Sequence, residues 1–520
     1  LCIPIYLWPL LESMDAMLSL KSLKPIQTTR EDGGKMIKAG EEEEPLTPMA
    51  RLFHEPGTNV YIITIIGWKT HVNPDLLKTN LMHTLLKHPR FSSVQVVNKD
   101  KGGDEMKYWV QTEVDLDNHF IVPADLDPNM DYSAADKLVE DYISNLSTTT
   151  IDMSRPMWDF HHLNIRTSDA HAVSVFRIHH SFGDGTSLMA LLLACTRKAD
   201  DHTDKALQAT TTSVTKKSNP VNKSSGFWSV LWLVWNTIIG VFMFLATALF
   251  FKDTETPLKG PPGVEFSPRR IIHRTVSLDD LKLVKNGINT TINDVVVGVA
   301  QAGLSRYLNR RYGDIKKDDG GATKKNNLPK SICLRAILFF NIRPYLGIHD
   351  LVDTTSEKVS EVRLGNKIGY VLYPFTIAFR DNPLDYVREA KAIMDRKKAS
   401  HEATSTYFVA KAVLKFFGIK ALGILSHKVF SSTTMWFSNV PGPREEIVFC
   451  GYPIAYIAST CYGHPNALMI DAVSYVNKMT FVLAVDEATI PDPHQLCDDL
   501  EESLKLMKDA VLQRGRIKHA

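Results

Sequence analysis

The order of apolar and polar residues along the chain predicts a protein that mixes strands and helices. Residues 60–66 are apolar except for Thr64, which is typical of a strand buried on both faces. Leucines at helical spacing follow Pro74 and predict a helix that ends at the break before Pro89. A closing amphipathic helix is predicted at residues 495–513. Further strands are predicted at residues 157–165, 172–178, 271–276, 331–340, 369–379, 448–457, 467–475 and 479–485.

Three stretches interrupt this pattern. Residues 1–43 precede the first patterned segment, and we expect them to form a disordered extension. Residues 197–225 are rich in Lys, Asp, Ser and Thr, which predicts a flexible linker. Residues 226–252 are almost uncharged and, at about 1.5 Å per residue, are long enough as a helix to cross a hydrocarbon core of about 30 Å. A buried core helix is the alternative, but the polar flanks and the tryptophans at one end favour contact with a membrane.

The length and composition of the chain indicate how many hydrophobic cores it forms and argue against nucleic acid as a partner. A chain of 520 residues with 44% hydrophobic content exceeds what one core usually organises, so we expect two domains, at residues 44–196 and 260–515. The net charge of +2 provides no global field that would attract nucleic acid. The six cysteines form no CxxC pair and no zinc-spaced cluster, so we predict no metal site and reduced thiols in a protein that faces the cytosol. No pattern in the chain predicts an oligomeric state.

The predicted strand at residues 172–178 runs directly into the segment His179–Gly185, with the sequence His-His-Ser-Phe-Gly-Asp-Gly. The end of a strand is a place where side chains can face a cleft. Because neighbouring strand residues point to opposite faces, only one of His179 and His180 can face a substrate, and the pattern does not choose between them. A neutral imidazole, with an ordinary pKa near 6.5, can remove the proton of a hydroxyl that attacks an acyl carbonyl.

Asp184 lies between two glycines, four residues after His180. It can either orient a histidine or form a buried ion pair that fixes the loop, and the tight backbone geometry of glycine favours the ion pair. An ordinary polar loop is the alternative for the histidine pair alone, but the complete HHxxxDG spacing is much rarer than such a pair.

The segment His179–Gly185 resembles the HHxxxDG motif of chloramphenicol acetyltransferase-like enzymes, peptide-synthetase condensation domains and the wax ester synthase/diacylglycerol acyltransferases. Further segments, from about Glu44 to the C-terminus, are similar to motifs of the last group and of its plant branch. These segments are Glu44–Pro48, Lys87–Phe91, Pro156–Trp158 (the PLW motif, with Met157 in place of Leu), Asn293–Val296 (the ND motif) and Ser438–Pro443 (the signature of the C-terminal domain).

The resemblance implies an α/β (α+β) fold of two chloramphenicol acetyltransferase-like domains, each a mixed sheet with flanking helices, with the active site in the tunnel between them. It implies that His180 is the general base, that His179 supports it and that Asp184 is structural. Similar enzymes pair this aspartate with an arginine of the other half, and Arg343 stands at that place. The sequence alone also makes Asn293-Asp294 typical of a helix N-cap. The other implied site residues are Gly185, Asn293, Asp294, Asn439, Pro156 and Trp158.

The activity implied by the resemblance is transfer of a fatty acyl group from acyl-CoA to a long-chain fatty alcohol, to diacylglycerol, or to both. The products are a wax ester and triacylglycerol. Acyl-CoA is then a co-substrate, and no other cofactor is expected. Two alternatives stay open. A soluble-alcohol acyltransferase of the same superfamily would carry a DFGWG-type segment, which this sequence lacks. A catalytically silent lipid-binding membrane protein would not need His180 and Asp184.

Membrane lipid is an expected partner because of residues 226–252. We expect the protein at the endoplasmic reticulum membrane, and also at the plasma membrane, with both halves facing the cytosol. If His180 shares one site with Arg343 and Asn439, a single crossing by the apolar segment would separate them. We therefore expect this segment to enter one leaflet as a bent or interfacial helix.

Overall fold

The computed structural model describes part of the chain, and the described residues from Glu44 onward form one compact unit. The expected N-terminal extension, nearly all of the expected linker and most of the expected apolar segment lie outside the described residues. Among the helices that are described, none is both long and apolar enough to span a bilayer. The described residues are 44–99, 105–124, 126–127, 130–198, 235, 238–239, 242, 246, 250–315, 325–343 and 359–519.

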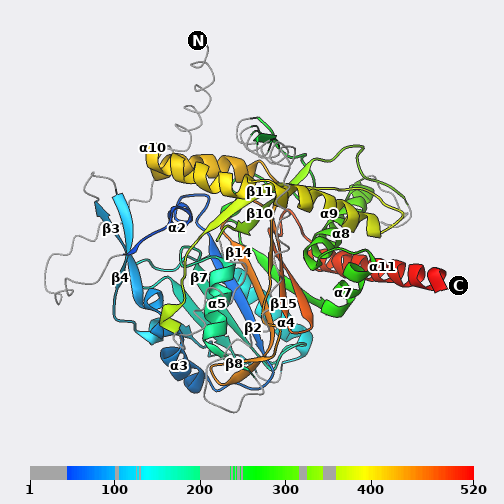
Figure 1. Cartoon of the computed structure of the whole chain (residues 1–520). Helices are drawn as coiled ribbons and strands as arrows, with labels where there is room; N and C mark the ends of the chain where they lie inside the picture. Colours follow the sequence, from blue (N-terminus) through cyan, green and yellow to red (C-terminus); the bar gives the residue numbers. More distant parts are fainter. Residues whose placement is uncertain are drawn as a thin grey trace, which may run out of the picture. The chain divides into compact units, whose positions relative to one another are not determined.

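A seven-stranded mixed sheet carries the histidine motif (Figure 1). In spatial order its strands are β5 (Phe120–Ile121), β6 (Trp158–Leu163), β7 (Ala172–His179), β2 (Tyr61–Trp68), β14 (Tyr452–Tyr462), β13 (Ile447–Phe449) and β8 (Thr196–Lys198). The strand predicted at residues 60–66 is confirmed as β2, which pairs antiparallel with β7 on one side and with β14 on the other. Because β13 and β14 come from the range expected for the C-terminal domain, both parts of the sequence build this sheet.

The single strand predicted at residues 448–457 is wrong. Two strands, β13 and β14, occupy this region and pair with each other in an antiparallel hairpin. Cys450 and Gly451 form the turn between them, with φ angles of 50° and 89°. Two consecutive positive φ angles are what a two-residue hairpin loop requires, and the glycine makes the second one easy.

A six-stranded mixed sheet forms the second domain. In spatial order its strands are β11 (Ile368–Phe375), β10 (Leu334–Asn341), β12 (Met435–Val440), β15 (Leu468–Tyr475), β16 (Lys478–Val485) and β9 (Arg270–Ser277). The central strand β12 pairs parallel with both β10 and β15, whereas the other pairs are antiparallel. A smaller sheet consists of β1 (Glu44–Pro45), β4 (Glu105–Gln111) and β3 (Ser93–Lys99). The predicted class, with two mixed sheets and flanking helices, is confirmed.

Three of the longer described helices are not predicted by the apolar pattern, namely α4 (Tyr132–Ser147), α9 (Leu384–Ala399) and α10 (Glu402–Ser431). The apolar residues of α10 are distributed around the whole helix and do not form one stripe, so its sequence does not show the period of an amphipathic helix. The described helices are α2 (Pro48–Leu52), α3 (Pro74–His83), α4 (Tyr132–Ser147), α5 (Gly185–Ala194), α7 (Leu278–Gly287), α8 (Ile292–Ile315), α9 (Leu384–Ala399), α10 (Glu402–Ser431) and α11 (Pro493–His519). Short 3-10 helices lie at Leu85–Lys87, Pro89–Ser92, Leu116–Asn118, Val264–Phe266 and Val359–Glu361.

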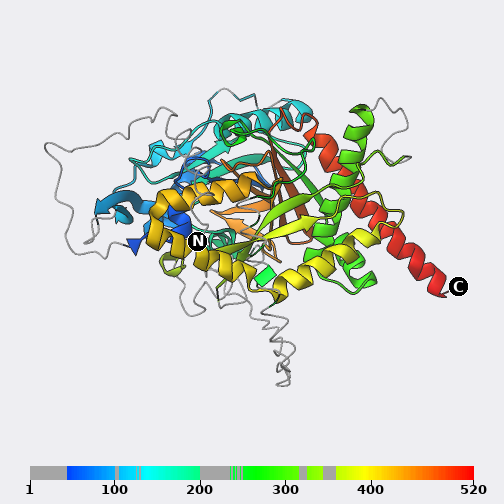
Figure 2. The ribbon, with the colours of Figure 1, turned by 90° about the horizontal axis from the view of Figure 1, so that it is seen from above.

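Side chains of the second sheet alternate between two hydrophobic cores. Along β10, Ile337 packs in the core of the first sheet, whereas Ala336 and Leu338 pack in the core beneath the helices. Helices α7, α8, α9 and α11 supply that second core, and Figure 2 shows α8 and α11 side by side. These helices cover one face of the second sheet. Side chains of its other face, such as Ile337, pack in the core of the first sheet.

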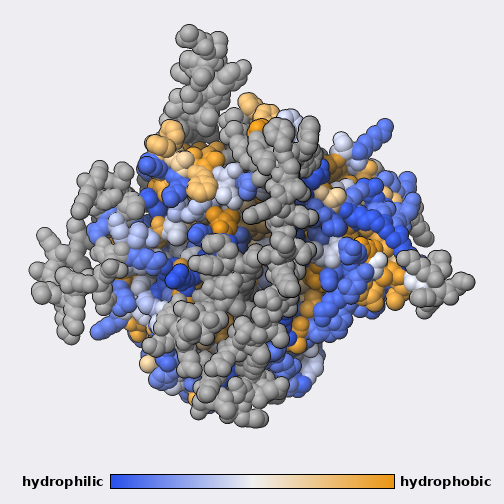
Figure 3. All heavy atoms as spheres, in the orientation of Figure 1, coloured by the Kyte–Doolittle hydropathy of each residue, from blue (hydrophilic) through white to orange (hydrophobic). Residues whose placement is uncertain are grey.

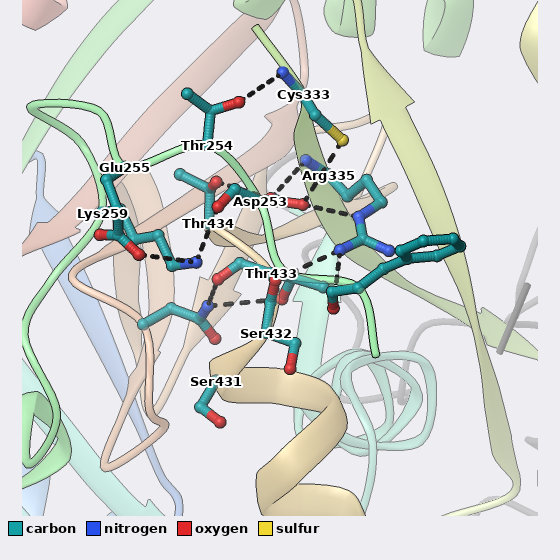
Figure 4. Close-up of polar contacts among 12 residues, drawn as sticks. Asp253, Thr254, Glu255, Lys259, Cys333, Arg335, Ser431, Ser432, Thr433 and Thr434 are labelled. Atoms are coloured by element: carbon teal, nitrogen blue, oxygen red, sulfur yellow. Dashed lines mark hydrogen bonds and ion pairs between the residues drawn. The ribbon is translucent and has the colours of Figure 1, made fainter. Parts of the chain in front are cut away.

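A buried ion pair attaches the chain beyond the apolar segment to the second sheet (Figure 4). Asp253 Oδ1 accepts a hydrogen bond of 2.6 Å from Arg335 Nε on β10, and Asp253 Oδ2 accepts from the backbone N–H of Arg335 and the hydroxyl of Thr434. The side chains of Asp253 and Arg335 are 0% and 6% exposed. The N–H of Asp253 donates to the carbonyl of Ser432, which caps α10. The end of the apolar segment is therefore fixed beside the C-terminal end of α10.

Candidate active site

A cavity of about 440 Å³ lies between the two sheets and is lined by residues of both. The histidine motif contributes His180, Asp184 and Gly185, the start of α8 contributes Asn293, and the end of β12 contributes Asn439. Apolar side chains from both sheets make up most of the remaining wall. Such a wall suits a ligand that carries a hydrocarbon chain.

His180 directly follows β7 and is the histidine that lines the cavity. Its N–H donates to the carbonyl of Val60 at 2.9 Å, and its own carbonyl accepts from Asn366 Nδ2 at 2.8 Å. The ring packs on Phe53, with centroids 4.3 Å apart. Burial lowers the pKa of His180 below its ordinary value, although its own carbonyl group, Asp184 and Asn366 oppose the shift. The imidazole is therefore neutral at pH 7, which is the form that a general base needs.

His179 does not line the cavity and is held by its own domain. Its Nδ1 lies 2.7 Å from Ser181 Oγ, and its Nε2 lies 3.0 Å from the carbonyl oxygen of Phe53. The ring stacks on His54, with centroids 4.1 Å apart. Burial lowers the pKa of His179 well below its ordinary value. Of the two histidines that the pattern left open, the structure places His180 at the cavity, and His179 supports the motif from behind.

Asp184 joins the two parts of the chain. Its Oδ1 accepts from the N–H of Ser187 at 3.0 Å, which makes Asp184 the N-cap of α5. Its Oδ2 accepts from Arg343 Nη1 at 2.6 Å and from the N–H of Lys367 at 3.1 Å. In the described part of the chain, no hydrogen bond joins Asp184 to His180. The expected ion pair with Arg343 is present, and it anchors the loop rather than orienting the imidazole.

Two glycines let the motif lie close to its neighbours. A Cβ atom at Gly183 would come within 2.6 Å of Ser187 Oγ, which is too close for any real side chain. A Cβ atom at Gly185 would come within 3.1 Å of a methyl group of Val440 on β12. The HHxxxDG spacing therefore reflects packing of the loop against α5 and against the second sheet.

The expected residues Asn293 and Asn439 meet at the cavity, whereas Asp294 does not line it. Asn439 Nδ2 donates to Asn293 Oδ1 at 3.0 Å. Asp294 is 0% exposed, and its Oδ2 accepts from the N–H of Thr291 at 3.0 Å. The N–H of Asp294 donates in return to Thr291 Oγ1 at 3.2 Å, so the pair forms a capping box at the start of α8. The expected cap exists, but Thr291 occupies the N-cap position instead of Asn293 or Asp294.

Pro156 and Trp158 also lie away from the cavity. Trp158 is 0% exposed, and its Nε1 donates to the carbonyl of Phe91 at 3.0 Å. The carbonyl of Met157 accepts from the N–H of His179 at 3.0 Å. Pro156 lines a separate, smaller groove. This motif supports the strand that carries the histidines and does not contribute side chains to the cavity wall.

Asp471 on β15, which no motif of the sequence indicates, lines the same cavity and is 5% exposed. Burial raises the pKa of Asp471 to about 8. The available signal was an acidic residue inside an otherwise apolar predicted strand, because aspartate is almost never buried unless it is paired.

Comparisons with known proteins decide the family. Residues 77–296 match the family model described as the wax ester synthase/diacylglycerol acyltransferase catalytic domain, and residues 364–508 match the C-terminal domain of the same group. Wax ester synthase/diacylglycerol acyltransferase 5 of Arabidopsis thaliana is 46% identical over 486 residues, which cover 91% of this chain and 95% of that protein. This chain belongs to the wax ester synthase/diacylglycerol acyltransferase family. It is therefore an acyltransferase.

Further relatives agree with this family. Wax ester synthase/diacylglycerol acyltransferase 4 of Arabidopsis thaliana is 46% identical over 490 residues, which cover 92% of each chain. The structure of the wax ester synthase/diacylglycerol acyltransferase from Marinobacter aquaeolei VT8 is 18% identical, with a TM-score of 0.57 and coverage of 90% of this chain and 99% of that one. The first condensation domain of the CDA synthetase is 11% identical, with a TM-score of 0.51 and coverage of 90% and 96%. These two structures support the fold alone.

Proposed function

We propose that this chain transfers a fatty acyl group from acyl-CoA to a long-chain fatty alcohol or to diacylglycerol, with His180 as the general base. The observation that carries this proposal is a neutral His180 on the wall of an apolar cavity to which both sheets contribute. Hydrocarbon chains favour such a wall, because removal of apolar area from water contributes about 25 cal/mol per Å².

In the proposed reaction, the imidazole of His180 removes the proton of the substrate hydroxyl while the hydroxyl oxygen attacks the thioester carbonyl. The C–S bond then breaks, and the imidazolium returns the proton to the departing CoA sulfur. Because Nδ1 of His180 is buried without a partner among the described residues, we assign proton transfer to Nε2. Asp184 and Arg343 are positioning residues. Acyl-CoA serves as the co-substrate, and the reaction requires no other cofactor.

Incorporation of labelled acyl-CoA into hexadecanol and diacylglycerol by microsomes tests the proposal. We expect His180→Ala to lower the rate by about 100-fold or more. His83→Ala, at an exposed histidine of α3, is the matched control and should keep the wild-type rate. Equal activity of His180→Ala and wild type would contradict the proposal. Transfer only to a short, soluble alcohol, or no transfer at all, would instead favour one of the two alternative functions.

We also propose that α10 contacts membrane lipid. Phe408, Phe416 and Phe417 on this helix are 59%, 72% and 74% exposed. Figure 3 shows apolar side chains on the upper left of this face, where Figure 1 draws α10. An exposed helix that combines phenylalanine with lysine suits the boundary between anionic headgroups and acyl chains. The exposed lysines of α10 are Lys411, Lys415, Lys420 and Lys428.

Flotation with phosphatidylcholine vesicles, with and without phosphatidylserine, tests this contact. We expect the double variant Phe416→Ser/Phe417→Ser to float less with both kinds of vesicle, and wild type to float more when phosphatidylserine is present. Phe266→Ser is the matched control, because Phe266 is 74% exposed but lies outside α10. Equal flotation of the double variant and the control would contradict the proposed surface.

For localisation, we propose the endoplasmic reticulum membrane, and also the plasma membrane, with both halves in the cytosol. The pairing of β2 with β14 supports this arrangement, because these strands precede and follow residues 226–252 in the sequence. If that segment crossed the bilayer once, it would put neighbouring strands on opposite sides. Tags placed before Lys223 and after Lys252 should show equal protease access in sealed microsomes, and opposite protection would contradict this topology.

A further inference from the structure

A polar patch interrupts the apolar wall of the cavity. It consists of Ser438 on β12, Thr460 on β14 and Asp471 on β15, which all line the cavity. Thr460 and Asp471 are 2% and 5% exposed. Among the described residues, neither Asp471 Oδ2 nor Thr460 Oγ1 has a hydrogen-bond partner. Because buried polar atoms are almost always hydrogen-bonded, two such atoms at a cavity indicate a ligand that completes them.

In the part of the chain that the structure describes, Asp471 lacks the ion pair that compensates several other buried carboxylates. Asp184 pairs with Arg343, and Asp253 pairs with Arg335. In the described residues Asp471 has no such ion pair. Burial raises the pKa of Asp471 to about 8, and the nearby hydroxyls of Thr460 and Ser438 offset this only in part. The carboxyl group is therefore protonated at neutral pH, so it can donate a hydrogen bond as well as accept one.

The polar patch lies apart from the reacting end of the cavity. Ser438 is in register with Asp471 on the neighbouring strand, and Val440, two residues further along β12, packs against Gly185 of the histidine motif. Two residues of a strand span about 7 Å, which separates the level of the polar patch from the level of the motif. The polar patch is thus placed to meet the chain of a bound substrate instead of its reacting group.

We propose that the polar patch binds a hydroxyl group carried on the hydrocarbon chain of a substrate, so that the enzyme prefers a hydroxylated chain to a plain one. This inference rests on the proposed acyl transfer, and the bound hydroxyl is not the one that is acylated. A plain alkyl chain offers no hydrogen-bond partner to Asp471 Oδ2 or Thr460 Oγ1, so covering these two buried atoms with it costs free energy. A chain hydroxyl can accept from the acid and donate to the threonine, which removes that penalty.

The hydroxyl can belong to the acyl donor or to the alcohol, and two arms of a microsomal competition assay distinguish them. One arm offers hexadecanol against hexadecanediols with the second hydroxyl at different positions, with palmitoyl-CoA as donor. The other arm offers palmitoyl-CoA against hydroxypalmitoyl-CoA isomers, with hexadecanol as acceptor. In one arm, we expect kcat/KM for one hydroxylated substrate to exceed that of the plain substrate by about tenfold or more.

Two variants assign this ratio to the polar patch. We expect Asp471→Leu to abolish the preference, because leucine has no polar atom to satisfy. Asp471→Asn keeps a donor and an acceptor and should retain most of the preference. Each variant is first checked for a thermal midpoint near that of wild type. If neither variant folds, the ratio of kcat/KM for hydroxylated and plain substrates in wild type alone tests the proposal.

The possible failures are distinguishable. Equal kcat/KM for plain and hydroxylated substrates in wild type would overturn this inference and leave acyl transfer to hexadecanol intact. A preference that persists in folded Asp471→Leu would also overturn it. If wild type transferred no acyl group to any acceptor, the proposed function itself would fail.

Discussion

Arg343 Nη1 donates a hydrogen bond of 2.6 Å to Asp184 Oδ2, although 159 positions separate the two residues in the sequence. Their side chains are 7% and 4% exposed, so each charge is compensated by the other and hardly at all by water. The pair ties the loop that follows His180 to the segment that follows β10. The position of His180 relative to the second sheet therefore depends on this contact.

Breaking this ion pair should destabilise the fold through the charge that is left behind. We expect Asp184→Asn or Arg343→Met to lower the free energy of unfolding by about 3 kcal/mol each, because removal of one partner leaves a buried, unpaired charge. The double variant should lose less than the sum of the two. A double-mutant cycle in denaturant unfolding measures the coupling, and strictly additive losses would contradict it. As a control, Lys391→Ala breaks a pair whose side chains are 40% and 56% exposed, and should cost about 0.5 kcal/mol or less.

Acid should destabilise the protein through buried histidines. Burial lowers the pKa of both His88 and His162 from 6.5 to about 4. Above pH 6.5 neither the folded nor the unfolded chain binds these protons, so stability does not depend on pH through them. Between pH 6.5 and 4 only the unfolded chain binds these protons. As the pH decreases through this range, the free energy of unfolding therefore falls by about 1.4 kcal/mol per pH unit for each histidine.

Denaturant unfolding between pH 7.5 and 5 measures this slope. His162→Asn should reduce the slope by the contribution of one proton. His83→Asn, at an exposed histidine of α3, is the control and should leave the slope unchanged. A stability that stayed constant from pH 7.5 to 5 would show that these histidines are not held neutral in the folded state.

Gly418 should be required for the kink of α10. Its φ and ψ angles of 78° and 178° interrupt the helix and belong to a region that is almost exclusive to glycine. No atom lies within 4 Å of the Cβ that alanine would add, so the cost of Gly418→Ala arises from the backbone alone, at about 1–3 kcal/mol. Gly515→Ala, in α11 and equally free of neighbours, should be neutral or stabilising. A thermal midpoint for Gly418→Ala equal to that of Gly515→Ala would contradict this prediction.

The ion pair between Asp253 and Arg335 should hold the chain beyond the apolar segment. We expect Asp253→Asn to lower the free energy of unfolding by about 3 kcal/mol, because the buried guanidinium of Arg335 loses the carboxylate of Asp253. Limited proteolysis near residues 250–259 should become faster in this variant. Asp395→Asn is the control, because Asp395 pairs with Lys391 and the two side chains are 56% and 40% exposed, so its loss should change little. Equal cleavage of both variants would contradict the anchoring role.

Local patterns predicted the elements whose environment is uniform along their length. The strand β2 is buried on both faces, so nearly all of its residues are apolar, and this pattern can be recognised without knowledge of the neighbouring strands. The pairing of β2 with β14 depends on the tertiary structure, and the sequence of residues 452–462 does not specify which sheet these residues join. The helix α10 escaped prediction because exposed phenylalanines erase its apolar stripe.

The candidate site divides in the same way. Strand alternation predicted that one histidine of the pair faces away, but the choice of His180 came from family resemblance. Arg343 could be predicted as the partner of Asp184 only from the same resemblance. The charge of an aspartate does not indicate which of many distant basic residues in the sequence it contacts. Asp471 belongs to no motif. Its role as a cavity residue could not be predicted, because the cavity forms only when the two sheets pack together.

The place of β14 in the first sheet has a consequence for synthesis of the chain. During translation, β2 and β7 leave the ribosome long before residues 452–462, and at about 5–20 residues per second this delay lasts tens of seconds. For that time β2 is an apolar edge strand, which readily pairs with other chains. A nascent chain at this stage is a natural client for a chaperone, and a recombinant fragment that stops before residue 447 is expected to aggregate instead of folding.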